Sequence, residues 1–155
     1  MIALVDVSIL VALFDPDHAN HQVAHDWFED QQAAGWATCP LTENGLIRVT
    51  SSPSYFDPPH RPADVIQQLR AFRQSPGHHF WPDSITMTDE RMFVASIVRG
   101  HKQVTDIYLL GLATKMGGRF VTLDTSIPLA AVKGATDVNL LVISAAPGGS
   151  TSEDT

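Results

Sequence analysis

Four acidic residues of this 155-residue chain stand at the edges of apolar segments. Asp6 follows the apolar run Ile2 to Val5, Asp124 follows a second such run, and Glu43 and Asp106 lie near the starts of segments with helical spacing. Parallel α/β sheets bind ligands at the carboxyl ends of their strands, where these acids would meet. Because gathered carboxylates repel one another unless a cation lies among them, the pattern predicts a cation site.

The chemistry of such a site is set by its oxygen ligands, which suit Mg²⁺ or Mn²⁺ rather than zinc. One or two such cations can lower the pKa of a water molecule and stabilise a leaving oxygen, which is the chemistry of phosphodiester hydrolysis. Hydroxyl groups flank the acids and could hydrogen-bond to them: Ser8, Thr105, Thr122 and Ser126. Capping and turn roles explain each hydroxyl and each acid taken singly, but they do not call for two strand-ending aspartates in one sheet.

The order of apolar patterns predicts a single α/β domain over residues 1–146, an α/β/α sandwich with a mostly parallel sheet of four or five strands, and a flexible tail over residues 147–155. Strands are expected over Ile2 to Val5, Trp36 to Cys39, His79 to Trp81 at an edge, Arg119 to Leu123 and Asn139 to Ile143. Helices are expected over Val7 to Phe14, His18 to Ala34, from Pro40, from Pro62, from Thr88 to Gly100, over Val104 to Met116, and briefly over Ile127 to Val132.

Some finer details also follow from the pattern. Thr105 is placed to cap its helix, with Asp106 at the first helical position. The inward face of the helix that begins at Pro62 is predicted to be Val65, Ile66, Leu69 and Phe72.

Composition excludes several classes of protein. A net charge of −7 argues against a surface that coats nucleic acid, for which a pI above about 9 is expected. No apolar run has the length of a membrane helix, and no secretory signal is present, so a cytoplasmic protein is expected. The single cysteine, Cys39, is read as a buried thiol.

Two local clusters allow more than one interpretation. Half of the basic residues lie between positions 91 and 119, where they could grip phosphates or simply form solvated helix faces. His18, His21 and His25 share one side of a helix at a spacing that zinc can use, but solvent-facing histidines are the favoured interpretation.

Four short motifs, in this order, resemble those of PIN-domain proteins, and in particular the VapC toxins of bacterial type II toxin–antitoxin modules. They are an apolar strand leading into Asp6 to Ser8, then Leu41 to Arg48, Gln103 to Asp106 with the Tyr108 segment, and Phe120 to Asp124. The resemblance spans residues 1 to about 143. Thr125 departs from it, because many relatives have a basic residue or asparagine after the last aspartate.

The resemblance implies an endoribonuclease that depends on Mg²⁺, with Mn²⁺ able to substitute, and that cuts specific RNAs. By motif position, the acidic quartet would be Asp6, Glu43, Asp106 and Asp124, with Asp6 and Asp106 as the direct metal ligands. It also implies a homodimer, whose RNA path the basic 91–119 stretch would border, and inhibition by a cognate VapB-type antitoxin. Val7 to Phe14 and Val23 to Phe28 would be walls of the antitoxin groove.

Other functions remain as alternatives. A catalytically silent PIN-like module that binds RNA or protein is the main one, although such copies usually lose one of the acids. A phosphatase of the haloacid-dehalogenase type is disfavoured because Ser8 stands where a second aspartate is needed, and a phospho-accepting receiver lacks its acidic pair and its lysine.

Overall fold

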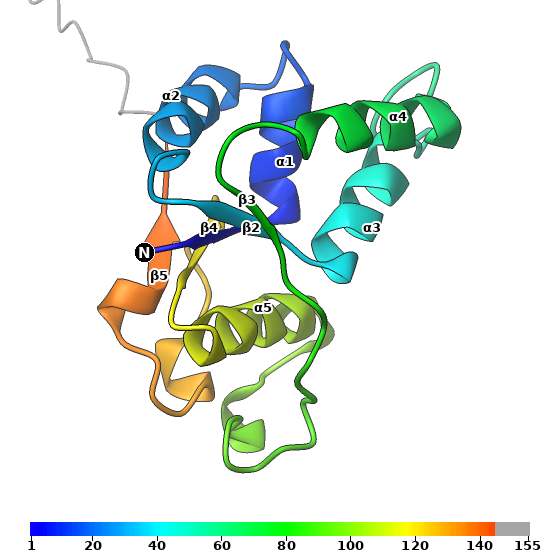
Figure 1. The fold of residues 1–155 in the computed structure, drawn as a ribbon. Helices are drawn as coiled ribbons and strands as arrows, with labels where there is room; N and C mark the ends of the chain where they lie inside the picture. Colours follow the sequence, from blue (N-terminus) through cyan, green and yellow to red (C-terminus); the bar gives the residue numbers. More distant parts are fainter. Residues whose placement is uncertain (145–155) are drawn as a thin grey trace, which may run out of the picture.

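The computed structural model describes residues 1–144, which form a parallel sheet with helices on both faces (Figure 1). The sheet has five strands in the order β3-β2-β1-β4-β5, all parallel. They are β1 (Ala3–Val5), β2 (Trp36–Thr38), β3 (His78–Phe80), β4 (Arg119–Thr122) and β5 (Leu140–Val142). The predicted fold class is confirmed, as is the edge position of the third strand. The predicted tail over 147–155 lies outside the described residues.

Two helical layers cover the sheet, with α1 to α4 on one face and α5 on the other (Figure 1). The helices are α1 (Val7–Phe14), α2 (His21–Gln31), α3 (Pro40–Thr50), α4 (Pro62–Phe72) and α5 (Val104–Lys115). Four of the predicted starts are confirmed, at Val7, Pro40, Pro62 and Val104. Two of these are prolines, whose fixed φ suits the first helical position. No helix among residues 1–144 is long and apolar enough to cross a membrane.

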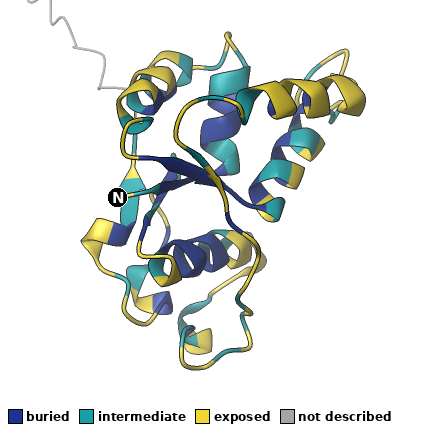
Figure 2. Ribbon diagram, viewed as in Figure 1, coloured by how far each residue is buried: buried dark blue, intermediate teal, exposed yellow. Residues whose placement is uncertain are grey.

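Each central strand packs on both helical layers because its side chains alternate between the two faces. In β1, Val5 belongs to the core beneath α1, whereas Leu4 belongs to the core beneath α5. In β4, Val121 and Phe120 alternate in the same way. Burial on both faces explains why all three residues of β1, and Phe120 and Val121 of β4, are apolar (Figure 2).

Helix α5 begins at Val104 as predicted, but its cap residue differs from the predicted one. The helix begins at Val104, directly after a 3-10 turn over His101–Gln103, and its cap residue is Gln103. The 3-10 turn leads straight into the helix, so Thr105 lies inside α5 and does not cap it. Asp106 is therefore in the first turn of α5 and not at its first position.

The helix predicted from Thr88 to Gly100 is wrong. The segment contains turns and one 3-10 turn over Ala95–Ile97. A long-range pairing replaces the helical hydrogen bonds here, because Phe93 forms an antiparallel bridge with Val132 and the Val94 amide donates to the Ala131 carbonyl. The predicted helix over Ile127 to Val132 is likewise reduced to a 3-10 turn, Leu129–Ala131.

Two smaller predictions are also corrected. Val65 and Leu69 of α4 are buried, but Ile66 is 41% exposed and does not face the core. The second helix begins at His21 rather than His18, because turns occupy the residues before it.

Candidate active site

Asp6 links the first strand to the first helix. Its backbone amide donates to the Val121 carbonyl, which extends the pairing of β1 with β4 by one residue. Its carboxylate Oδ1 accepts a hydrogen bond of 2.7 Å from the Val7 amide, so the side chain caps α1. Only 6% of Asp6 is exposed.

Two hydroxyl groups tie the ends of β1 and β4 together through Asp6. Thr122 Oγ1 donates to Asp6 Oδ2 at 2.6 Å and accepts from the Asp124 amide at 3.0 Å. Ser8 Oγ donates to the same oxygen at 3.0 Å and accepts from the Leu123 amide at 3.2 Å. Of the two roles that the sequence analysis allowed for Ser8 and Thr122, the structure shows hydrogen bonding to a carboxylate.

Asp124 stands two residues after the end of β4, in a tight turn. Its Oδ1 accepts hydrogen bonds from the amide of Ser126 at 2.8 Å and from the hydroxyl of Ser126 at 2.7 Å. These bonds lower the pKa of Asp124, with a further contribution from a hydrogen bond to Asp106. Ser126 therefore supports an acid as predicted, whereas Thr105 makes no side-chain hydrogen bond among residues 1–144.

Asp106 reaches the same edge from α5. Desolvation raises its pKa to about 7, with further contributions from the charge of Asp6 and from its hydrogen bond and charge interaction with Asp124. Burial also raises the pKa of Asp6, and the charge of Asp124 adds to this increase. The structure thus brings three of the four predicted acids close enough to perturb one another electrostatically.

Glu43 lies on the other flank of this edge, in the first turn of α3. Its Oε2 accepts from Thr38 Oγ1 at 2.6 Å, and Thr38 ends β2 beside β1, where Leu4 is paired with Ala37. Its Oε1 lies 3.5 Å from Arg73 Nη1. Glu43 is therefore at the carboxyl edge of the sheet as predicted, but its side-chain partners are a hydroxyl and a cation rather than the aspartates.

The position of α3 depends on a close approach to α1. Gly45 lies so near Val7 that a Cβ atom at position 45 would be 2.5 Å from Val7 Cγ2. Any side chain there would push α3 away from α1, together with Glu43 two residues earlier. The absence of a side chain at this position thus sets the place of one acid.

Three residues around Glu43 were missed by the sequence analysis: Thr38, Arg73 and His78. His78 Nε2 lies 2.8 Å from Thr38 Oγ1, and since that hydroxyl donates its hydrogen to Glu43, the histidine must donate from Nε2. Burial is the main reason that the pKa of His78 falls to about 4, so the ring is neutral near pH 7. Thr38 could have been found as a hydroxyl that ends a strand, as Thr122 does, but nothing in the sequence links Arg73 to Glu43.

The donor set at this edge fits a hard divalent cation. All four candidate acids offer oxygen, and Asp6 already has three hydrogen bonds that orient its two oxygens. Burial is the main cause of the raised pKa of Asp106, and the charges of Asp6 and Asp124 add to it; a cation would relieve this added repulsion. No three of these acids have ligand atoms that all lie within 4.8 Å of one another, so a bound cation would draw the side chains closer.

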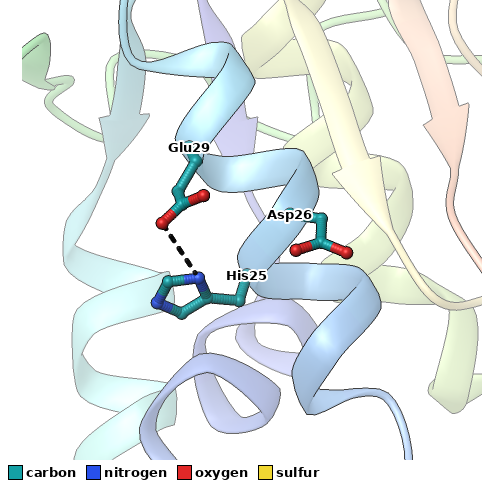
Figure 3. A group of neighbouring side chains, drawn as sticks. All are labelled: His25, Asp26 and Glu29. Atoms are coloured by element: carbon teal, nitrogen blue, oxygen red, sulfur yellow. Dashed lines mark ion pairs between the residues drawn. The ribbon is translucent and has the colours of Figure 1, made fainter.

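Among residues 1–144, the one group with that spacing lies elsewhere, on the surface of α2 (Figure 3). It comprises His25, Asp26 and Glu29, all exposed, and His25 Nδ1 lies 3.5 Å from Glu29 Oε1. Glu29 lies four residues after His25, so the two share one side of the helix; the sequence analysis did not consider this carboxylate beside the histidines. His21 Nδ1 instead lies 2.7 Å from the Ala12 carbonyl oxygen, and His18 Nδ1 accepts from the Asn20 amide, so the three histidines do not form one site.

Several cations of the basic 91–119 stretch contact the chain itself. Arg91 pairs with Asp89 at 3.1 Å, and Arg119 Nε donates to the Val138 carbonyl at 2.9 Å. Lys115 Nζ lies 3.5 Å from the backbone oxygen of Ser84. Arg99 and Lys102 have no side-chain contact of this kind within residues 1–144.

Known proteins are similar to this chain in sequence and in fold. A PIN domain family model matches residues 3–133. The chain is 43% identical over 143 residues to ribonuclease VapC44 of Mycobacterium tuberculosis, which covers 92% of this chain and 100% of the relative. It is 39% identical over 138 residues to ribonuclease VapC39 of the same organism, covering 89% and 99%.

A solved structure provides an independent comparison of the fold. It is the crystal structure of VapBC2 from Rickettsia felis bound to a DNA fragment from their promoter, which matches with a TM-score of 0.56 at 12% identity, over 81% of this chain and 90% of that chain. At this identity the likeness concerns the fold alone. The family model and the long relatives carry the assignment: the chain belongs to the PIN-domain family, alongside proteins named as VapC ribonucleases.

Proposed function

We propose that this protein is the toxin of a type II toxin–antitoxin module and acts as a divalent-cation-dependent endoribonuclease. The observation that carries the proposal is the convergence of Asp6, Asp106 and Asp124 at the carboxyl edge of the sheet, where they shift one another's pKa values. The relatives named as ribonucleases, which match over nearly their full length, support the same activity.

Asp6, Asp106, Asp124 and Glu43 would hold the cation, which we propose is Mg²⁺, with Mn²⁺ as a substitute. When bound, such a cation lowers the pKa of a water molecule and stabilises charge on the leaving oxygen of a phosphodiester. The chain itself positions the ligands, because Thr122 and Ser8 fix Asp6 Oδ2, and Ser126 fixes Asp124 Oδ1. With a pKa of about 7, Asp106 holds a proton for part of the time at neutral pH, and that proton leaves when the carboxylate becomes a ligand.

The proposed partners are an RNA substrate, a VapB-type antitoxin and a second copy of the chain, all in the cytoplasm. A hollow of about 370 Å³ lies between α1, α2 and α4, with Leu13, Phe14 and Phe28 in its lining. It supports the idea that α1 and α2 form walls for an apolar segment of the antitoxin.

The test is incubation of the purified protein, freed of any antitoxin, with total bacterial RNA. Discrete fragments are expected with Mg²⁺ or Mn²⁺ and none with EDTA, and Asp6→Asn should give none with either metal. Mapping the fragment ends would then identify the target. Expression of wild type in a bacterial host should arrest growth, and expression of Asp6→Asn should not.

A catalytically silent module that binds RNA or protein remains the second candidate. If wild type cuts no RNA under any metal condition, or if Asp6→Asn is as toxic as wild type, catalysis by these acids is ruled out. The contact between Arg73 and Glu43 would then need an explanation that does not involve catalysis.

A further inference from the structure

A cleft of about 470 Å³ opens beside Glu43, between α3, α4 and the start of β3. Its polar lining residues are Glu43, Asn44, Arg70, Arg73, Gln74 and His78. The cleft lies outside the packed core, and none of the three aspartates of the candidate site lines it. Because Glu43 forms part of its wall, a ligand in this cleft would lie next to the proposed catalytic edge.

The cleft is cationic in a protein whose net charge is −7. Arg70 and Arg73 are its positive groups and Glu43 is its one acid, whereas His78 is neutral near pH 7 because its pKa is about 4. No salt bridge of Arg70 is present within residues 1–144. The charge of the cleft therefore favours an anionic ligand.

Arg73 is held loosely and has donors to spare. Its 3.5 Å contact with Glu43 is longer than the roughly 2.7–2.9 Å of a strong charge-assisted hydrogen bond. Its guanidinium lies 4.9 Å from the ring centroid of Phe80, and Phe80 keeps 45% of its surface exposed. A guanidinium next to an exposed aromatic ring is a combination that binds single-stranded nucleic acid, the first through phosphate and the second through a base.

We propose that this cleft binds the backbone of the RNA strand next to the scissile phosphate, with Arg70 and Arg73 as phosphate contacts. The inference rests on the proposed ribonuclease function and adds to it the path of the substrate. It places that path over α4 and β3, on the opposite flank of the site from the basic 91–119 stretch, where Arg91 and Arg119 already have partners in the chain. A strand leaving the cleft passes Glu43 before it reaches Asp6.

The test measures binding of a fluorescein-labelled oligouridine to the full chain in EDTA, where no cleavage occurs, over a series of salt concentrations. The charge-neutralising pair Arg70→Gln with Arg73→Gln should weaken binding, and the slope of log affinity against log salt should become shallower by about 1.4, or about 0.7 for each lost phosphate contact. Arg70→Gln alone leaves the contact between Glu43 and Arg73 in place and should change the slope by about half as much.

The matched control is Arg61→Gln with Lys133→Gln, which removes the same charge at exposed positions outside both the cleft lining and the basic 91–119 stretch and should leave the slope near that of wild type. Circular dichroism of every variant checks folding. If the cleft pair behaves like the control, the cleft does not bind RNA and the proposal is overturned. It is also overturned if the cleft pair loses binding of poly-glutamate but keeps binding of oligouridine, since the cleft would then be a site for an acidic peptide.

Cleavage of total RNA by wild type with Mg²⁺ separates this proposal from the one on which it rests. Cleavage together with an unaffected cleft pair refutes the RNA path alone. If wild type neither cleaves RNA nor binds oligouridine, the ribonuclease function and the path fail together.

Discussion

The two flanks of the candidate site compensate negative charge in different ways. On the β1 and β4 flank, Asp6, Asp106 and Asp124 interact mainly with hydroxyls, amides and one another, and burial raises the pKa values of Asp6 and Asp106. On the β2 flank, Glu43 already has a cation of the chain, Arg73, within 3.5 Å. The first flank therefore needs an added cation, whereas the second is partly neutralised without one.

The largest effect is expected on RNA cleavage, when one acid of each flank is neutralised in turn. Asp106→Asn should lower kcat/KM for RNA cleavage by about 10³-fold or more, and Glu43→Gln by about 10-fold to 100-fold, because Arg73 already offsets part of the glutamate's charge. Cleavage of a mapped RNA target with Mg²⁺ measures both. Equal losses would show that Glu43 acts as a full member of the aspartate group.

Each flank also contains a fully buried threonine that supports its acid, and the pair can be compared directly. Thr122→Val removes the hydroxyl that joins Asp6 to the Asp124 amide, and we expect it to lower the free energy of unfolding by about 1–3 kcal/mol. Thr38→Val should cost less, because Glu43 keeps its contact with Arg73.

Urea denaturation of the metal-free proteins measures the difference between the threonine variants. Thr122→Ser and Thr38→Ser are the controls, since serine retains the hydroxyl and should restore most of the stability. If Thr38→Val is the more damaging of the two, the ranking of the flanks is reversed.

A further expected effect is a dependence of metal-free stability on pH. Because the folded pKa of Asp106 is raised to about 7 from 3.8, its contribution to stability is fully present below the unfolded pKa and is lost as pH rises through the folded value. The melting temperature of Asp106→Asn relative to wild type should therefore increase between about pH 4 and pH 7 and level off above that.

Thermal melts in EDTA across this pH range check the prediction, with Glu43→Gln as the variant from the other flank. Adding Mg²⁺ should raise the melting temperature of wild type and should have a smaller effect on Asp106→Asn. If the melting temperatures of Asp106→Asn and wild type differ by the same amount at all pH values, the pKa of Asp106 is not raised in the folded protein.

The sequence predicted the aspartate flank better than the glutamate flank. Asp6, Ser8 and Thr122 were found because strand ends and the residues beside them can be read from local apolar patterns. Arg73 and His78 were not found, because Arg73 caps the end of α4 and His78 begins β3, so neither lies at the carboxyl end of a strand. Local patterns do not show which side chains from such places pack beside the site.

The same limit explains the errors in the fold. The pattern after Thr88 has helical spacing, but the bridge between Phe93 and Val132 determines the structure there. Ile66 fits the apolar stripe of α4 and yet is exposed. In both places a tertiary arrangement overrides a local preference.

The close approach of Gly45 to Val7 has a consequence for how the protein tolerates mutation. In a survey of all single substitutions scored by growth arrest, almost every other residue at position 45 should abolish the arrest and let the cells grow, as substitutions at the acidic positions should. It has no group that can take part in catalysis, so its intolerance would come only from the space between two helices. The profile of position 45 should therefore differ from that of Glu43 in one respect: its variants should lose melting temperature along with toxicity.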